Sequence, residues 1–241
     1  MLRVSFLLFS AVAMAADGSS LRFSTGDEVV ARMMARDNER QAALLGYTAV
    51  RRYVLENQRH HKRAEMLVRM TCRRDGSKQF ETISATGWGG AQKHVFPRLL
   101  EAETEASQPG LRDRSRIIPA NYVFEMVGSE LLDGRPVYVI AITPKTPNKY
   151  LMEGRIWIDA DEYAIVRIEG KPAKNPSFWT KSIHFVHNYE KRGSFWFPVS
   201  DRSVTDARIF GSTAVTIEYF DYTPNTSALS ASREPARAGQ R

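Results

Sequence analysis

The sequence predicts an α+β fold dominated by one large antiparallel sheet. From residue 121 to residue 223, runs rich in β-branched and aromatic residues alternate with short turn sequences. Asp133-Gly134, Lys191-Arg192-Gly193 and Gly211-Ser212 are turns of the kind that adopt tight hairpin geometry. Parallel neighbours would need long crossovers, so these short links predict a meander. The strands expected here cover residues 121–128, 136–143, 155–159, 163–169, 181–189, 194–202 and 213–223.

The amino terminus has the layout of a secretory signal. Arg3 supplies the positive charge, residues 4–12 form a short apolar run, and Ala13-Met14-Ala15 is a small-x-small cleavage site. We therefore expect residues 1–15 to be a signal peptide that is cleaved near Ala15, followed by a flexible lead-in over residues 16–24. Cys72 is the single cysteine, so no internal disulfide can form. An exported chain without disulfides fits a bacterial periplasm.

Residues 25–223 are expected to form a single domain that begins with a helix. Thr25 and Glu28 have the spacing of a capping box, and the residues that follow place Val29, Val30, Met33 and Met34 on one face. This helix should end near residues 44–46. A first strand over residues 47–56 and a hairpin of residues 64–73 and 78–86 are expected next.

A second amphipathic helix should begin around Val95 and Phe96, after a glycine-rich hinge over residues 87–90. Residues 107–115 contain Pro109-Gly110 and are expected to form a loop. Residues 224–241 have no apolar period and should be a disordered tail.

Two polar motifs in the meander could suggest metal binding. His184 and His187 are three residues apart, but on a strand such positions point to opposite faces. Asp159-Ala160-Asp161-Glu162 lies between two strands and lacks the further ligands of a calcium loop, so we interpret it as a turn. No nucleophile elbow is present. We expect a protein that is not an enzyme and has no metal or cofactor.

The formal charge of +7 would favour nucleic acid as a partner in the cytoplasm. After export, the charge would either attract anionic lipid head groups or only keep the protein soluble. Phe178 and Trp179 lie in a proline-flanked connection. They are candidates for a membrane or partner contact, and the alternative is that this loop folds back on the sheet.

Several local phrases resemble those of one known superfamily. They are Leu132-Asp133-Gly134-Arg135-Pro136-Val137-Tyr138, Gly154-Arg155-Ile156-Trp157-Ile158-Asp159, Val166-Arg167-Ile168-Glu169-Gly170 and Phe195-Trp196-Phe197-Pro198. Together with the order of elements over the mature chain, they make the protein similar to the periplasmic lipoprotein carriers, the outer-membrane lipoprotein-sorting proteins of LolA, LolB and RseB type.

This resemblance implies a strongly curved antiparallel sheet, an incomplete β-barrel, with helices covering its concave face. It implies a carrier that takes up acyl chains of lipoproteins or lipids for transfer to the outer membrane, with a helical lid that moves near residues 87–90. We expect the protein to be a monomer. A sensor or interaction module that contacts envelope membrane proteins is the alternative. The candidate cavity residues are Met33, Met34, Met66, Val68, Met70, Leu99, Tyr122, Phe124, Met126, Phe185, Phe197 and Ile217.

The chain also departs from the superfamily pattern. The carriers have an arginine-proline pair that opens an early strand, whereas the corresponding hairpin here begins Lys62-Arg63-Ala64 without proline. A gating arginine is therefore not carried over, and Arg51 and Arg69 are candidates by position alone.

Overall fold

The computed structural model describes residues 25–148, 150–175, 180–207 and 211–226. The expected signal peptide and lead-in, Phe178, Trp179 and the tail beyond residue 226 lie outside these ranges. The first part of the chain forms α1 (Gly26–Ala43), β1 (Leu44–Asn57), β2 (Lys62–Arg73), β3 (Lys78–Gly87), η1 (a π-helix, Ala91–Val95), α2 (Phe96–Ala106) and α3 (Pro109–Ser115). The meander forms β4 (Tyr122–Leu132), β5 (Arg135–Pro144), β6 (Met152–Asp159), β7 (Ile165–Pro172), β8 (Thr180–Arg192), β9 (Phe195–Ala207) and β10 (Gly211–Thr226).

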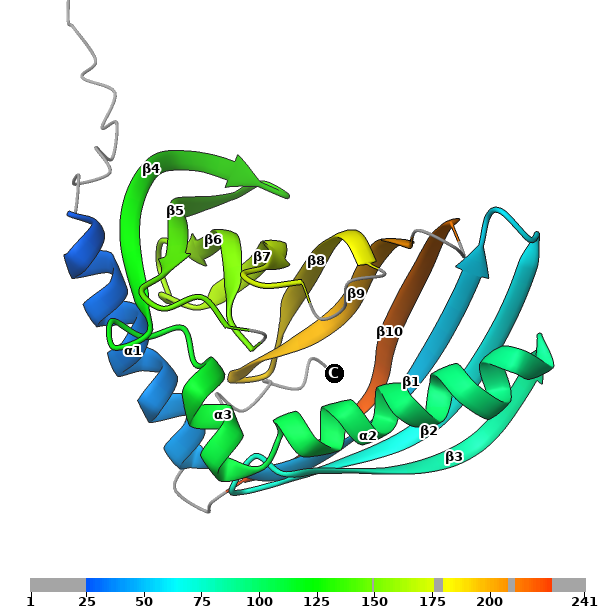
Figure 1. Cartoon of the computed structure of the whole chain (residues 1–241). Coiled ribbons are helices and arrows are strands. Elements are labelled where there is room, and N and C mark those ends of the chain that lie inside the picture. The colour runs from blue at the N-terminus through cyan, green and yellow to red at the C-terminus, as the bar shows by residue number, and fades with distance from the viewer. Residues whose placement is uncertain (1–24, 149, 176–179, 208–210, 227–241) are drawn as a thin grey trace, which may run out of the picture.

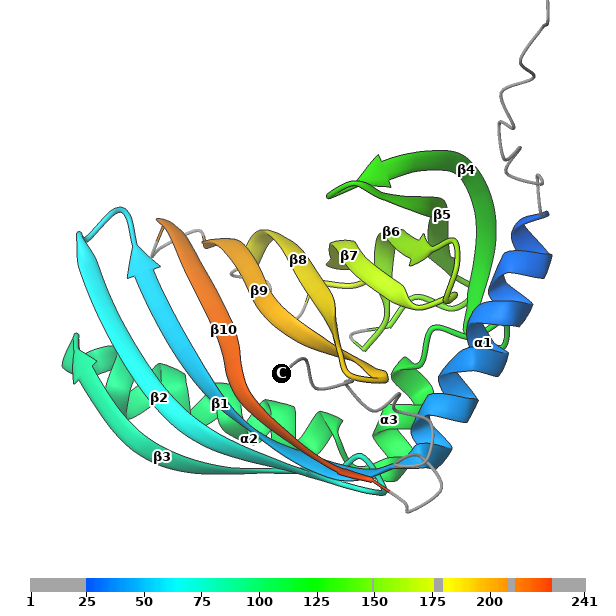
Figure 2. The same ribbon diagram turned by 180° about the vertical axis from the view of Figure 1, so that it is seen from behind.

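One antiparallel sheet contains all ten strands, in the order β3-β2-β1-β10-β9-β8-β7-β6-β5-β4. The last strand pairs with the first, so the three amino-terminal strands continue the meander. The sheet bends strongly but does not close, because β3 and β4 remain as its two edges (Figures 1 and 2). The predicted α+β class and the predicted curved, incomplete barrel are confirmed.

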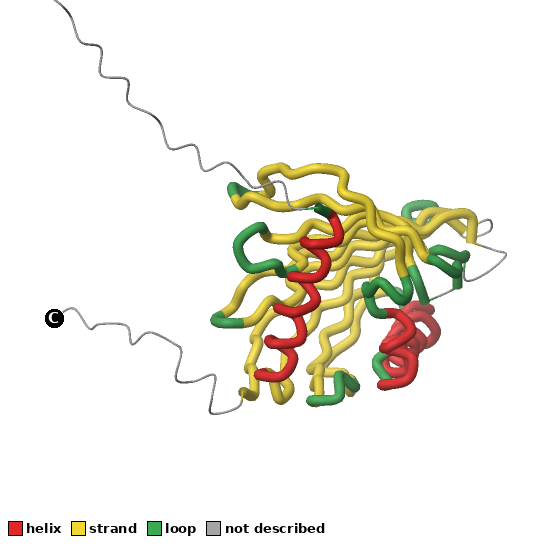
Figure 3. The backbone as a smooth tube through the Cα atoms, turned by 90° about the vertical axis from the view of Figure 1, so that its left-hand side faces the viewer, coloured by secondary structure: helices red, strands yellow, loops and turns green. Residues whose placement is uncertain are grey.

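The helices lie on one face of this sheet. β3 and β4 are at opposite edges, so the segment that joins them, with η1, α2 and α3, has to cross from one edge towards the other. Figure 3 shows α1 lying across the strands, with the other helices grouped to one side. In Figure 1, α2 follows β1, β2 and β3 on the inside of the bend.

A single row of cross-strand partners shows which residues share this concave face. Directly paired residues in adjacent strands point to the same side of a sheet. The row runs from β3 to β4 through Ala85, Met66, Tyr53, Ile217, Asp201, His187, Ile168, Ile156, Ile140 and Met126. It is apolar towards both edges and polar only on β8 and β9.

Two apolar clusters cover the concave face, one under each long helix. Val29, Val30 and Met33 of α1 pack on isoleucines of β5, β6 and β7. Phe96 of α2 packs on β1 and β2, beside Tyr53. We call these the α1 half and the α2 half of the sheet.

A third cluster lies on the opposite face of β5, β6 and β7. It contains Val137, Val139, Trp157 and Val166, with Trp196 packed against it. Trp157 Nε1 donates a hydrogen bond to Glu130 Oε1 of β4 at 2.6 Å. Trp157 is therefore buried on the outside of the bend.

Most local expectations hold, with three differences. Residues 109–115 form α3 rather than a loop, because Pro109 takes the first helical position instead of ending a turn. Only half of the capping box forms: Thr25 Oγ1 accepts from Glu28 N at 3.4 Å, while the Glu28 carboxylate pairs with Arg32. β10 continues to Thr226, so residues 224–226 are strand rather than tail.

The Asp159 turn forms as predicted and has a further role. Asp159 Oδ1 accepts from the backbone nitrogens of Asp161 and Glu162 at 3.1 and 2.8 Å. Its carboxylate, which is buried, also pairs with Arg135 Nη2 at 2.7 Å. The side chain therefore fixes the β6–β7 turn against β5.

Candidate functional site: two cavities on the concave face

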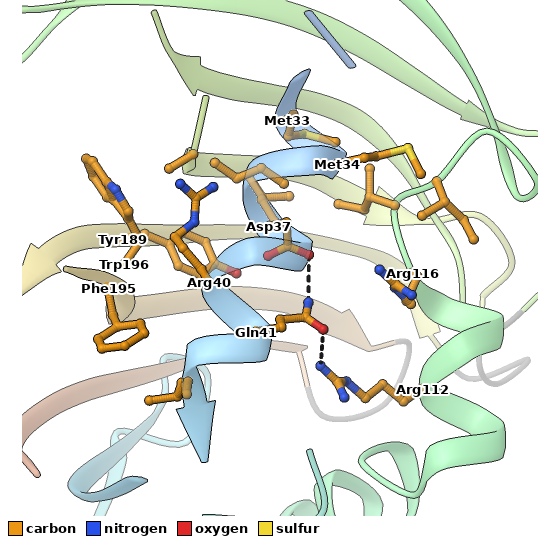
Figure 4. Close-up of a pocket in the computed structure, with 16 residues that line it drawn as sticks. Met33, Met34, Asp37, Arg40, Gln41, Arg112, Arg116, Tyr189, Phe195 and Trp196 are labelled. Atoms are coloured by element: carbon orange, nitrogen blue, oxygen red, sulfur yellow. Dashed lines mark hydrogen bonds between the residues drawn. The ribbon is translucent and has the colours of Figure 1, made fainter. Parts of the chain in front are cut away.

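A first cavity of about 330 Å³ lies between α1, α3 and strands β7 to β9. Met33 and Met34 line it from α1, with Ile165 and Ile168 from β7 on the opposite side. Tyr189, Phe195 and Trp196 close its far wall (Figure 4). We call it the α1 cavity. Its walls are largely apolar, and its charged residues are confined to α1 and the region of α3.

A second cavity of about 360 Å³ lies between α2 and strands β8 to β10, and we call it the α2 cavity. Phe185, Val215 and Ile217 contribute apolar walls, and Arg51, Glu103 and Asp201 contribute charge. Tyr189 lines both cavities. The two spaces therefore adjoin across one tyrosine at the centre of the concave face.

A buried ionic network joins α2 to the sheet at the α2 cavity. Arg51 of β1 is only 1% exposed, and its Nη1 lies 2.5 Å from Glu103 Oε2 of α2. Tyr53 Oη donates to Glu103 Oε1 at 2.9 Å and accepts from Arg51 Nη1 at 3.1 Å. The guanidinium also stacks on Tyr219, 4.6 Å from the ring centre. We call this group the Arg51–Glu103 network.

The network keeps Arg51 charged despite its burial. Burial acts to lower the pKa of Arg51, but Tyr219, Glu103 and Tyr53 outweigh it and raise that pKa well above the ordinary value. Lys78 Nζ lies 3.8 Å from Glu103 Oε2. Burial, and then repulsion from Arg51, lowers the pKa of Lys78. The Glu103 carboxylate thus pairs with two cations, Arg51 and Lys78, in a poorly solvated space. Removing this carboxylate should therefore lower the stability of the fold substantially.

The polar part of the concave row lies beside this network. Tyr219 Oη donates to Asp201 Oδ2, and His187 Nδ1 lies 2.7 Å from Asp201 Oδ1. Burial and the neighbouring Asp201 raise the pKa of Tyr219 well above its ordinary value, so the phenol stays protonated. This Tyr219–Asp201–His187 chain spans β10, β9 and β8.

Arg51 and Arg69, the two arginines that are candidates by position, have different surroundings. Arg69 has a side chain that is 56% exposed and lies 3.4 Å from Glu81 on the neighbouring edge strand. Arg51 is the arginine that contacts a helix. Glycine is required at residue 87, since its φ is +83° and a Cβ there would lie 2.5 Å from Arg63 O.

The sequence-predicted cavity residues separate into two groups. Met33 and Met34 line the α1 cavity, and Phe185 and Ile217 line the α2 cavity. The other candidates pack within or beside the core without lining either cavity: Met66, Val68, Met70, Leu99, Tyr122, Phe124, Met126 and Phe197. Of the charged lining residues, Glu103 and Asp201 were not predicted as site residues, and Arg51 was a candidate by position alone.

The histidines lie as strand geometry predicts. His184 faces Glu169, with Nε2 3.5 Å from Oε1, while His187 faces Asp201 on the other side of the sheet. Within the described ranges, no three His, Cys, Asp or Glu side chains group in a way that could hold a metal ion. No helix among the described residues is both long and apolar enough to span a membrane.

Comparison with known proteins gives one family match and several similar structures. Residues 119–225 match a family of unknown function, DUF5686. No curated protein matches the chain. An outer membrane lipoprotein-sorting protein domain from Vibrio parahaemolyticus is 14% identical, with a TM-score of 0.45, and the match covers 84% of this chain and 93% of that one.

A LolA-superfamily protein from Nitrosomonas europaea is 10% identical, with a TM-score of 0.39, over 85% of this chain and 95% of that one. MucB is 12% identical, with a TM-score of 0.30, over 87% of this chain and 97% of that one. The superfamily whose phrases the sequence resembles is thus represented among the similar structures. At these identities the matches assign neither cargo nor partner.

Proposed function

We propose that this protein is an exported, non-enzymatic carrier that shelters acyl chains of lipoproteins or lipids on its concave face and delivers them to the outer membrane. The observation that carries the proposal is the α1 cavity, an apolar space between a helix and the sheet. Its volume of about 330 Å³ falls in the range of small-molecule sites, roughly 300–1,000 Å³. The leader pattern of residues 1–15 supports export.

Burial of hydrocarbon supplies enough affinity without any covalent step. Each buried methylene contributes about 0.8 kcal/mol, so ten of them contribute about 8 kcal/mol. A free energy of that size corresponds to a dissociation constant of about 1 μM. Such binding holds a chain in water and still releases it to a membrane.

The cover over the α1 cavity is suited to release. Three buried side chains of α1, Val29, Val30 and Met33, anchor it to the sheet. The helix runs directly into β1 at Leu44. Apolar contacts have no fixed direction, so the helix can shift over the sheet and then re-form these contacts.

Lipid binding can be tested with the mature protein. Native mass spectrometry and solvent extraction should find co-purifying acyl compounds, and a fluorescent fatty acid should bind and be displaced by palmitate. Ile117→Trp, which fills the α1 cavity from the segment after α3, should weaken binding at least tenfold. Ile83→Trp, on the exposed face of an edge strand, should not. Absence of both extracted lipid and probe binding would refute the carrier function.

A second candidate is an envelope sensor or interaction module. β4 is an edge strand, and it leaves Val123, Val127 and Leu131 exposed by 55%, 51% and 73%. An exposed apolar edge favours pairing with an extended segment of another chain. Crosslinking of the wild type in envelope extracts should capture a partner protein. Val127→Lys should abolish this capture and leave fatty-acid binding intact. Equal capture by the wild type and by Val127→Lys would count against this candidate.

A further inference from the structure

Cations concentrate where the α1 cavity opens towards α3. Arg112 and Arg116 line the cavity there, whereas Arg40 lines it on the side of Tyr189 and Trp196 (Figure 4). Among the described residues, Asp37 is the only carboxylate in the lining. A smaller cavity of about 200 Å³ adjoins it, sharing Gln41, Leu44 and Arg112 as lining residues. That second space adds Arg73, Arg74 and Lys78, and its lining contains no carboxylate among the residues that the structure describes. The shared entrance on the α3 side therefore carries Arg73, Arg74, Arg112 and Arg116, whereas Lys78 pairs with Glu103.

The three arginines of the α1 cavity are held by uncharged groups. Arg40 Nη1 and Nη2 donate to the carbonyl oxygens of Glu162 and Tyr163 at 3.1 and 3.2 Å. Arg112 Nη1 donates to Asp75 O at 3.1 Å, and Arg116 Nη2 reaches Asn38 Oδ1 at 3.5 Å. Among the described residues, none of the three forms an ion pair with a carboxylate. Their charge is available to a ligand.

The position of Arg112 is built into the backbone around it. Gly76 has φ of +84°, and a Cβ at that residue would lie 2.4 Å from Arg112 Nη1. The guanidinium thus packs directly on a turn that only glycine fits. On its other side, Nη2 reaches Gln41 Oε1 of α1 at 3.5 Å. Arg112 bridges the β2–β3 turn and α1 at the mouth of the cavity.

Asp37 lies among these arginines without neutralising them. Burial raises the pKa of its carboxyl, and the attraction of Arg40, Arg116 and Arg112 opposes that rise. Its Oδ2 accepts from Gln41 Nε2 at 2.6 Å. One carboxylate facing three guanidiniums leaves excess positive charge beside apolar walls.

We propose that this entrance binds the anionic head group of an amphiphile, a phosphate or carboxylate, while its acyl chain occupies the α1 cavity. The inference rests on the proposed carrier function and adds a charge requirement to the cargo. Guanidinium groups suit it because their planar donors match phosphate and carboxylate oxygens in pairs. Arg112 and Arg116 are the principal contacts, and Arg73 and Arg74 attract the anion from further away.

The experiment compares ligands with one acyl chain and different heads. Isothermal titration with lysophosphatidic acid and with the monoacylglycerol of the same chain should give at least tenfold tighter binding of the anionic ligand. Raising sodium chloride from 50 to 500 mM should reduce this difference, since the arginines are only partly buried. Inorganic phosphate alone is the third arm, and its binding should be too weak to detect at millimolar concentration.

Matched variants identify the residues. The double variant Arg112→Gln/Arg116→Gln should lose the preference for the anionic head and retain monoacylglycerol binding. Arg114→Gln, an exposed arginine on the same helix that does not line the cavity, should retain the preference. Circular dichroism and thermal melting confirm that each variant is folded.

The remaining outcomes separate the two proposals. Equal affinity for the two lipids would overturn the head-group assignment and leave the carrier function standing. Phosphate binding as tight as that of lysophosphatidic acid would overturn the assignment to an amphiphile, because the anion alone would be the ligand. If neither lipid binds, the carrier function and the head-group site fail together.

Discussion

The two halves of the concave face hold their helices by different means. The α1 half combines apolar packing of Val29, Val30 and Met33 with hydrogen bonds from Arg40 to backbone carbonyls of the β6–β7 turn. The α2 half combines apolar packing around Phe96 with the buried Arg51–Glu103 network. Apolar packing tolerates sliding, whereas a buried charge pair is satisfied in one geometry only. Because a buried ion pair is present only in the α2 half, we predict that α1 moves over the sheet more readily than α2.

The largest effect is expected when the network loses its carboxylate. Glu103→Gln leaves Arg51 buried without a counter-charge, and breaking a buried pair costs about 3–5 kcal/mol. We expect the lower end, because Glu103 is 27% exposed. Urea unfolding measures the loss, and hydrogen exchange should show reduced protection in α2 and β1 to β3 with α1 unchanged. Glu105→Gln, exposed on the same helix, is the control. Equal stability of the two variants would contradict a stabilising role of the Arg51–Glu103 network.

Truncating the α1 anchor should have a smaller and complementary effect. Met33 is 4% exposed, and Met33→Ala should cost about 2–3 kcal/mol through lost contacts and a new void. Protection should fall in α1 and persist in α2, which reverses the pattern expected for Glu103→Gln. Leu131→Ala at a position 73% exposed provides the control. If both helices lose protection together in either variant, the two halves open as one unit and the comparison fails.

The helix cap of α1 provides a milder change on the same half. Thr25 Oγ1 accepts from Glu28 N at 3.4 Å, and removing such a cap costs about 0.5–1 kcal/mol. Thr25→Ala should therefore lower the urea midpoint slightly and increase exchange only in the first turn of α1. Thr82→Ala, exposed on β3, controls for loss of a threonine hydroxyl. Increased exchange in α2 would be inconsistent with independent anchoring.

The parts of this fold that were predictable from the sequence are those encoded by local chemistry. The hairpin turn at Asp133-Gly134 and the first helix follow from neighbouring residues. α3 was mistaken for a loop, because Pro109-Gly110 is as suitable for a turn as for the first turn of a helix. The local sequence does not distinguish a loop from a helix here, and the contacts of Arg112 and Arg116 with other elements are visible only in the folded structure.

The charged parts of the site could not be predicted because they depend on distant pairing. Arginine is rarely fully buried, so Arg51 in a strand is expected to reach solvent. Its partner Glu103 is 52 residues away, on a helix whose docking is set by the apolar contacts of Phe96. The polar centre of the concave row similarly requires the register of five strands to bring Asp201 and His187 between two apolar regions. Apolar candidates such as Met33 could be predicted, because the helical periodicity of apolar residues is enough to identify the buried face of α1.

The smallest expected change in stability also tests the entrance to the α1 cavity. Burial raises the pKa of Asp37 in the folded protein above its ordinary value, so the folded state binds a proton more tightly than the unfolded state does. Its contribution to stability is therefore fully present at pH below 3.8, the ordinary value, and is lost as pH rises through the folded pKa. Asp37→Asn removes that loss and keeps an acceptor for Gln41, so it should be slightly more stable than the wild type at pH 7 and not at pH 3.

Asp37→Asn should also bind lysophosphatidic acid more tightly, because the three arginines lose their internal anion. Asp113→Asn, exposed on α3, should change neither quantity, and weaker binding by Asp37→Asn would mean that Asp37 orients the arginines instead of opposing the ligand.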